Sequence, residues 1–463
     1  MAAFDPGSFR DPAGRVVRQG DRIFRVITPE KAEETKAVLD APFFRRRAGA
    51  SIVQTWVPSD HDRKSVTSAI PGEFPLVIEH ERLEVISYPF EWPFSLLKRA
   101  AELHLEIHLE ALEEGFDLSD SSAYNVQFVG TRPLFIDVLS FRRYKAGSYW
   151  SGYKQFCEEF LAPLLLTAYR GVPFNEWYRG NLSGLDLVSL AKLLPARARF
   201  SLQAQMHVFM HARLMRRIKS HDGGLAAKQG QLPLASLKGI LRGMLSYVRS
   251  LRPRGLETTY WKDYEFNNSY LPEDAERKRT AVRAFVENAK PALLVDLGCN
   301  SGDFSELSIA AGAKSTVGVD FDQGALEAAV SRADEQRLPI LPIYQDLTNP
   351  SSSQGWAASE RGAFVERVQP DAVIALAVFH HLAIGKNIPF SAAIKWMVDL
   401  APKGLLEFVP KSDPMVQGML AHRGDMFLHY TEEKFRQELA RVATITSEAQ
   451  SSSSGRRIFT YER

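Results

Sequence analysis

Residues 292–324 read ALLVDLGCNSGDFSELSIAAGAKSTVGVDFDQG, and the rest of the chain is organised around this stretch. It opens with a short apolar run bounded by turn residues, which predicts a buried parallel strand. Gly298 and Gly302 follow, and both let the backbone approach a ligand closely. Asn300 stands between them and is the non-glycine residue that best tolerates a left-handed conformation. The stretch therefore predicts a strand that ends in a tight, ligand-facing turn.

The second half of the stretch predicts a helix and another strand. The helix over 303–311 would direct its N-terminus at the ligand. The strand over 316–319 ends in Asp320, about twenty residues after the turn, where a carboxylate can accept hydrogen bonds from both hydroxyls of a ribose. An ordinary strand–helix–strand turn without a ligand is the alternative interpretation.

The pattern D-x-G-x-N-x-G from Asp296, followed by V-G-V-D, resembles the first two motifs of class I S-adenosylmethionine-dependent methyltransferases. The dinucleotide fingerprint G-x-G-x-x-G is not present. The resemblance implies a Rossmann-like, seven-stranded C-terminal domain with S-adenosylmethionine as cofactor. The family usually has glycine at the middle position, where this chain has Asn300. In this stretch the resemblance assigns to the cofactor Asp296, Gly298, Asn300, Gly302, Asp320 and Phe321.

Three further residues are assigned to the cofactor. Asp346 follows the predicted strand 340–344 and matches the place where the family contacts the adenine amino group, for which a carboxylate is a suitable acceptor. Ala377 ends the apolar strand 371–377 and would give a backbone contact. Tyr270 precedes a helix that we expect to cover the pocket, although plain packing explains this residue equally well.

Catalytic candidates follow the same strand. Ligands of open α/β sheets bind at the carboxyl ends of strands, so His380 and His381 are expected beside the reactive methyl. Histidine has the pKa needed to take a proton from an acceptor hydroxyl. His381 is preferred, because the family pattern at this strand end matches H-L. Glu407, on the strand 404–409, is the third candidate. A purely structural role is the alternative for the histidines.

The segment 410–430 is predicted on the acceptor side of the sheet, where Lys411 and Arg423 are candidates to bind an acidic acceptor; solvated surface is the equal alternative. The expected acceptor is a small molecule, a glycan or a peptide. Together with E-F-V-P-K-x-D-P, the patterns R-G-D-M-F, N-I-P-F and Y-N-V-Q-F resemble a bacterial subgroup related to nodulation-associated methyltransferase-like proteins.

The N-terminal region predicts a small α+β fold. A hairpin is expected over 14–27 and a helix from Thr28-Pro29, with threonine as cap and proline at the first helical position. The runs 75–79 and 82–87 predict a strand pair, and a long helix should end near Gly115.

A loop after that helix carries Asp120 and Asn125, and Asp137 ends the following strand pair. These three residues resemble the acceptor-activating and magnesium-holding residues of protein-kinase-like folds. The glycine-rich loop and the V-A-I-K lysine are absent, and Arg25 is at best a substitute. Three interpretations stay open: active phosphotransfer, a kinase-like scaffold that holds the methyl acceptor, or acids that cap turns.

Residues from 149 to about 251 are predicted to be mostly helical. His207 and His211 stand one helical turn apart, but with no third ligand in view no metal is expected. The predicted domains are thus 1–148, an α+β region; 149–254, a helical region; and 255–463, the methyltransferase domain.

Composition narrows the class of protein. A chain of 463 residues, 45% hydrophobic, is long enough for two or three cores. Its formal charge of +2 provides no field for nucleic acid or an anionic membrane. Cys157 and Cys299 are too few for a disulfide framework. With neither an apolar run of about eighteen residues nor a leader, we expect a cytoplasmic protein without a membrane span; the sequence indicates no oligomeric state. Two other functions compete: a bifunctional kinase–methyltransferase and a non-catalytic nucleoside-binding protein.

Overall fold

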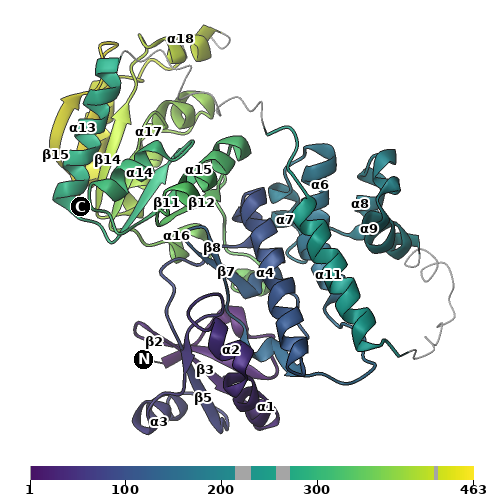
Figure 1. Cartoon of the computed structure of the whole chain (residues 1–463). Coiled ribbons are helices and arrows are strands. Elements are labelled where there is room, and N and C mark those ends of the chain that lie inside the picture. Colours follow the sequence, from purple (N-terminus) through teal and green to yellow (C-terminus); the bar gives the residue numbers. More distant parts are fainter. Residues whose placement is uncertain (1, 214–230, 257–271, 422–425) are drawn as a thin grey trace. The chain divides into compact units, whose positions relative to one another are not determined.

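The structure is a computed structural model that describes residues 2–213, 231–256, 272–421 and 426–463. The chain forms two compact units (Figure 1). Unit 1 comprises Met1–Leu256 and Ser353–Gly362, and unit 2 comprises Glu257–Ser352 and Ala363–Arg463. Residues 353–362 therefore belong to unit 1, although unit 2 precedes and follows them in the sequence. The three predicted domains stay predictions.

Unit 1 begins with an antiparallel sheet whose strands lie in the order β1-β2-β3-β5-β4. The strands are β1 (Ala2–Phe4), β2 (Gly14–Gln19), β3 (Arg22–Ile27), β4 (Thr55–Trp56) and β5 (Leu76–His80). The predicted hairpin is β2 and β3, which turn at Gly20 with a φ of 58°. Helices α1 (Pro29–Asp40), α2 (Pro42–Arg47) and α3 (Asp60–Ser68) accompany the sheet. Alternate apolar side chains, such as Val17 and Val77, form its core.

The expected strand over 82–87 is wrong, because these residues take no strand conformation. At Ser87, the last residue of the predicted strand, a side chain takes the place of a neighbouring strand. The buried Gln127 accepts the Ser87 N–H at 2.9 Å through Oε1 and donates to the Ser87 carbonyl at 3.0 Å through Nε2. One amide side chain thus satisfies both backbone groups of Ser87, so no ladder is needed there.

The rest of unit 1 is built on the long helix α4 (Phe94–Glu113). Two short antiparallel pairs follow: β6 (Phe116–Leu118) with β9 (Phe141–Arg143), and β7 (Val126–Val129) with β8 (Arg132–Phe135), which lie between them in the chain. The later described residues are mostly helical. Their helices are α5 (Tyr153–Phe156), α6 (Ala162–Arg170), α7 (Asn175–Gly180), α8 (Leu187–Leu193), α9 (Leu202–Ala204) and α11 (Leu234–Ser250).

Unit 2 is an α/β fold, as predicted, around a mostly parallel sheet in the order β12-β11-β10-β13-β14-β16-β15. Among the pairings of described strands in this sheet, only the two that β16 makes are antiparallel. The strands are β10 (Leu293–Leu297), β11 (Ser315–Asp320), β12 (Ile340–Tyr344), β13 (Ala372–Ala375), β14 (Lys403–Phe408), β15 (Thr444–Gln450) and β16 (Arg457–Glu462). Every residue of β10 and β13 is buried, as expected for inner parallel strands.

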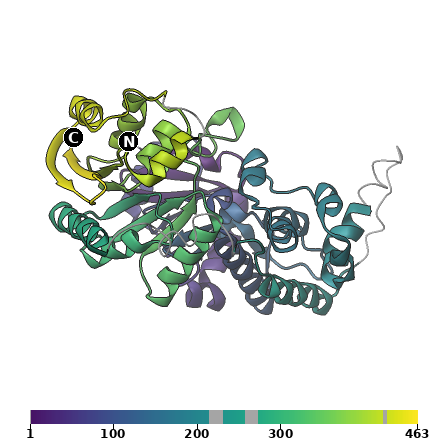
Figure 2. The ribbon, with the colours of Figure 1, turned by 90° about the horizontal axis from the view of Figure 1, so that it is seen from above.

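Helices cover this sheet in two groups (Figures 1 and 2). From β10 the chain builds the sheet outward through β11 to β12, and from β13 it builds outward through β14 on the other side. Because the crossovers between parallel strands are right-handed, this reversal places the helices of the two halves on opposite faces of the sheet. Helix α13 packs on α14, and α17 packs on α19. The helices are α13 (Pro272–Ala289), α14 (Asp303–Ala310), α15 (Gln323–Glu335), α16 (Phe364–Arg367), α17 (Phe390–Leu400), α18 (Pro414–Ala421) and α19 (Glu432–Val442). The reversal between β10 and β13 is where such sheets bind ligands.

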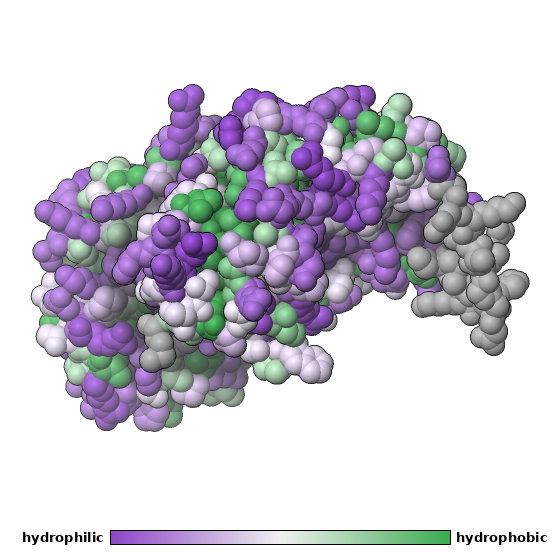
Figure 3. Space-filling view, turned by 90° about the horizontal axis from the view of Figure 1, so that it is seen from below, coloured by the Kyte–Doolittle hydropathy of each residue, from purple (hydrophilic) through white to green (hydrophobic). Residues whose placement is uncertain are grey.

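The surface mixes polar and apolar side chains. On the face in Figure 3, hydrophilic residues are interspersed with hydrophobic ones. Among the described residues, none of the helices combines the length and apolar character that crossing a bilayer requires.

The antiparallel edge of the unit 2 sheet depends on a glycine. Gly404 of β14 pairs with Tyr461 of β16, and a Cβ at position 404 would overlap the Tyr461 ring. We expect Gly404→Ala to destabilise the protein by about 1–3 kcal/mol, the usual cost of overpacking. Gly418→Ala is the matched control, because nothing lies within 4 Å of a Cβ there and alanine favours a helix. Urea unfolding measures both; equal stabilities of the two variants would contradict this packing.

Candidate functional site

The loop after β10 is held in left-handed backbone conformations. Gly298, Asn300 and Gly302 have φ values of 72°, 49° and 82°. A Cβ on Gly298 would lie 2.6 Å from Cγ2 of Val378, so this glycine is required by space as well as by φ. The Val378 contact also shows that the loop after β13 lies against the loop after β10. The two neighbouring strands therefore end in loops that touch.

Asp320 connects the end of β11 to the loop after β10. Its Oδ2 accepts the Asn300 N–H at 2.9 Å, and its Oδ1 accepts the Asp322 N–H at 2.9 Å. Burial raises the pKa of Asp320 to about 6. Because the folded state holds this proton more tightly than the unfolded chain, the group stabilises the fold below about pH 4 and loses that contribution as pH rises through 6. A carboxylate has about four lone-pair sites, so Asp320 can accept further hydrogen bonds.

Asp296, the first residue of the motif, lies beneath the loop. It is buried at 2% exposure and accepts the Ser305 hydroxyl at 2.7 Å, which links β10 to the first turn of α14. Burial is the main cause that raises the pKa of Asp296 to about 7. In this position the carboxyl group orders the strand–helix turn.

The other residues predicted for the cofactor lie at the same sheet edge. The Phe321 ring is 57% exposed just beyond β11. Asp346 follows β12 and accepts the Thr348 N–H at 2.8 Å and the Thr348 hydroxyl at 2.7 Å. Ala377 has a φ of 54° beyond β13. Tyr270 lies outside the described residues, so its role stays a prediction.

The two histidines after β13 are adjacent and largely buried. Their ring centroids lie 4.1 Å apart. His380 is 1% exposed, and among the described residues neither of its ring nitrogens has a hydrogen-bond partner. Burial lowers the pKa of His381 to about 4 and that of His380 well below its ordinary value. Both imidazoles are therefore neutral near pH 7, which is the protonation state that a general base must have.

Glu407, the third catalytic candidate, is fully buried in β14. Its Oε2 accepts the Ala377 N–H at 2.8 Å and lies 3.0 Å from Nζ of Lys278, and its Oε1 accepts the Ser451 hydroxyl at 2.9 Å. The sequence analysis missed Lys278 and Ser451. A signal for Lys278 did exist, because it stands in helical register with Val282, an apolar stripe position of α13. A lysine in such a stripe indicates a buried acidic partner.

The acceptor candidates are less well placed. Lys411 is partly buried after β14, and its carbonyl accepts the Gln417 side chain. Arg423 lies outside the described residues. Both assignments stay predictions.

The three kinase-like residues lie close together in unit 1. Asp137 accepts Nη1 of Arg25 at 2.6 Å through Oδ1 and the Ser140 hydroxyl through Oδ2. The Asn125 amide donates to the Ser140 hydroxyl at 3.3 Å. Burial, followed by the charge of Asp137, raises the pKa of Asp120. Within the described ranges, no group of three or more His, Cys, Asp or Glu side chains is arranged to hold a metal ion.

The residues at the edge of unit 2 fit a nucleoside cofactor. Gly298 and Gly302 take positive φ values and carry no side chain, so the backbone of the loop after β10 can lie close to a ligand. Asp320 keeps acceptor sites at the strand end where a ribose would lie. The donor and acceptor set therefore matches the predicted ligand class.

Comparison with known proteins gives one extensive relative. No family model matches the chain. The nodulation protein NoeA of Rhizobium meliloti (strain 1021) is 40% identical over 462 residues, which cover 99% of this chain and 95% of the relative. The predicted resemblance to nodulation-associated proteins is confirmed by this relative.

Solved structures give fainter likenesses to part of the chain. The N-methyltransferase NodS from Bradyrhizobium japonicum WM9 in complex with S-adenosyl-L-homocysteine is 14% identical, with 45% of this chain and 95% of that chain covered and a TM-score of 0.33. Magnesium protoporphyrin IX methyltransferase (ChlM) from Synechocystis PCC 6803 with bound SAM is 21% identical, with 43% and 88% covered and a TM-score of 0.30. Identity across nearly the whole length of both proteins is found with NoeA, and the chain belongs to the NoeA family.

Proposed function

We propose that unit 2 binds S-adenosylmethionine and transfers its methyl group to an acceptor. The observation that carries this proposal is the Asp320 carboxylate, which accepts the N–H of left-handed Asn300 at the carboxyl edge of β10 and β11. That arrangement supports a role for Asp320 as the acceptor of ribose hydroxyls, beside a loop that a ligand can approach closely. The Rossmann-like methyltransferase fold is part of the proposal, and the strand order of the sheet supports it.

Each cofactor residue has a separate role in this proposal. Asp320 accepts the ribose hydroxyls, Asp346 accepts the adenine amino group and the exposed Phe321 ring packs against the base. The loop from Gly298 to Gly302 accommodates the amino-acid end. Ala377 contributes a backbone contact. When bound, the cofactor supplies an electrophilic methyl group on a sulfonium.

The histidines after β13 are assigned to the acceptor. In-line displacement needs an aligned acceptor and, for a hydroxyl, a base for its proton. Neutral His381 is assigned as that base, and His380 shapes the wall of the site beside it. The acceptor is a small molecule, a glycan or a peptide that the N-terminal region presents. In unit 2, Lys411 and Arg423 are the candidates for binding an acidic acceptor.

The competing functions receive less support. For phosphotransfer, both Asp137 oxygens already accept hydrogen bonds, one of them from the cation Arg25, so a metal would have to displace an ion pair. A protein that only holds the nucleoside would explain Asp320 equally well, but it would not require a neutral histidine at the reactive edge. Turnover to S-adenosylhomocysteine separates the two.

Removal of the ribose acceptor tests cofactor binding. We expect Asp320→Ala to weaken S-adenosylmethionine binding about a hundredfold or more, because two hydrogen bonds to a charged group contribute about 1.5–3 kcal/mol each. Asp399→Ala is the control, since Asp399 pairs with Lys395 on the exposed side of α17. Isothermal titration calorimetry measures both affinities. Unchanged binding by Asp320→Ala would contradict the site.

The pH dependence of binding tests the charge state of Asp320. With its pKa at about 6, the free protein carries the carboxylate at pH 7 and its protonated form at pH 5. Affinity should fall by up to about tenfold over that range, since a proton must first be removed. Asp320→Asn should bind more weakly at pH 7 and show a smaller dependence. Calorimetry at both values measures this; equal slopes for the two proteins would assign the titration to another group.

Substitution of the proposed base separates chemistry from binding. We expect His381→Ala to lower turnover by about 10²–10⁴-fold, the usual contribution of a general base, with cofactor affinity within about threefold of wild type. The measurement is label transfer from methyl-labelled S-adenosylmethionine into an extract of the source cells. Because His381 has a pKa of about 4, wild-type turnover at saturating S-adenosylmethionine should stay constant from pH 8 down to about 5. Equal turnover by the variant would assign catalysis to proximity alone.

A further inference from the structure

We propose that Glu407 is a positioning residue, with Lys278 as its counter-ion, that holds the loop after β13 in its working conformation. This inference rests on the proposed function of unit 2. It assigns a role to Lys278 and Ser451. For Glu407 it replaces the predicted catalytic role with a positioning role exerted through the Ala377 backbone.

Glu407 is unsuited to exchange protons with an acceptor. It is 0% exposed, and each of its oxygens has a donor: Oε2 accepts from Ala377 and Lys278, and Oε1 accepts from Ser451. Lys278, 4% exposed, balances its charge. Removing one member of such a pair leaves an uncompensated buried charge, which explains why a lysine occupies the apolar stripe of α13.

Ala377 needs an external group to keep its conformation. A φ of 54° is unfavourable for a residue with a Cβ, and such conformations persist only where surrounding structure over-determines them. The hydrogen bond from Ala377 N–H to Oε2 of Glu407 is the restraint that the structure shows. Glu407 therefore stabilises a strained residue at the end of β13.

The conformation of Ala377 decides where its neighbours lie. Val378 follows it and contacts Gly298, so a shift of this loop would open the junction between the loops after β10 and β13. His380 and His381 come next in the chain. Through one amide, Glu407 thus sets the position of the cofactor loop and of the proposed base.

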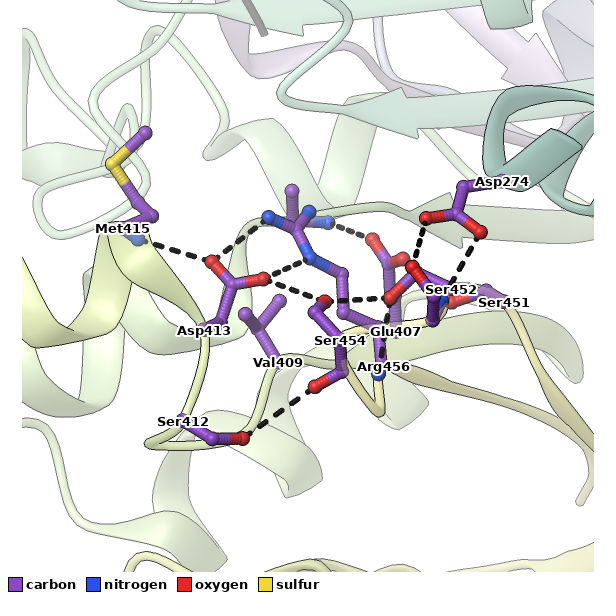
Figure 4. A network of polar contacts seen from close by, with 12 residues as sticks. Asp274, Glu407, Val409, Ser412, Asp413, Met415, Ser451, Ser452, Ser454 and Arg456 are labelled. Carbon is purple, nitrogen blue, oxygen red and sulfur yellow. Dashed lines mark hydrogen bonds and ion pairs between the residues drawn. The ribbon is translucent and has the colours of Figure 1, made fainter. Parts of the chain in front are cut away.

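Ser451 is itself fixed by a network around the turn between β15 and β16 (Figure 4). Ser453 donates to Asp274 through N–H and hydroxyl, both at 3.0 Å. Asp413 accepts the Ser454 hydroxyl at 3.0 Å and Nε of Arg456 at 2.7 Å. The turn is therefore anchored to α13 and to the segment after β14, which keeps the Ser451 hydroxyl on Glu407.

Paired substitutions separate the hydrogen bond from the charge. Glu407→Gln with Lys278→Met removes both charges but keeps an oxygen for the Ala377 N–H, whereas Glu407→Leu with Lys278→Met removes the oxygen too. The first should bind S-adenosylmethionine within about threefold of wild type, and the second about tenfold or more weakly, because a buried donor is left unpaired. Adding Ala377→Gly to the second should recover part of the affinity, since glycine adopts this φ without strain.

Hydrogen exchange of residues 376–382, measured by mass spectrometry in the free protein, is the second readout. Exchange should rise in the leucine variant (Glu407→Leu with Lys278→Met) and stay near wild type in the glutamine variant (Glu407→Gln with Lys278→Met). Identical affinity and identical exchange in the two variants would overturn the proposal. If the leucine variant does not fold, Ser451→Ala takes its place, with faster exchange and weaker binding expected, and no change in either overturns it. If wild type binds no S-adenosylmethionine, the proposed function fails, while the exchange comparison still decides the role of Glu407.

Discussion

Unit 2 depends on one kind of interaction. A carboxylate at the end of one strand accepts the N–H of a left-handed residue in the loop after the neighbouring strand of the sheet. It occurs twice. Asp320 of β11 accepts from Asn300 after β10, and Glu407 of β14 accepts from Ala377 after β13. Chains that leave the carboxyl edge of a buried sheet must turn sharply and still pair their amides. Here two acids satisfy that requirement for the two central strands.

Burying carboxyl groups at this edge of the sheet costs free energy, because a charged group loses its hydration. Glu407 is paired with Lys278, and Asp413 with Arg456, both inside the protein. Burial raises the pKa of Asp296 to about 7 and that of Asp320 to about 6, and it also raises the pKa of the paired Asp413. An unpaired buried charge costs several kcal/mol, so the paired acids are fixed structural groups. Asp296 and Asp320 are held by hydrogen bonds from Ser305, Asn300 and Asp322.

The sequence predicted the parts of this site that local chemistry determines. Glycine spacing, Asn300 and an acid at a strand end each carry their meaning within a few residues, so β10, β11 and Asp320 were found. Lys278 and Glu407 are 129 residues apart and Ser451 is 44 beyond Glu407, so no local pattern pairs them. The end of the failed strand over 82–87 has the same origin, since the partner of the Ser87 backbone is a glutamine side chain forty residues away. Local sequence patterns predict the helices and strands. How these elements are held together depends on buried side-chain contacts between residues that are far apart in the chain.

His380 shows how the two kinds of constraint meet. Burying a polar group without a partner costs about 1–3 kcal/mol, and both nitrogens of this 1% exposed imidazole lack one among the described residues. Packing alone would favour an apolar side chain of similar size there. Because His381 lies 4.1 Å away, protonating one ring disfavours protonating the other, and burial keeps both rings neutral near pH 7. A buried imidazole pair that is kept neutral is the form that the proposed base requires, so the cost of burying it is consistent with a role in the proposed function.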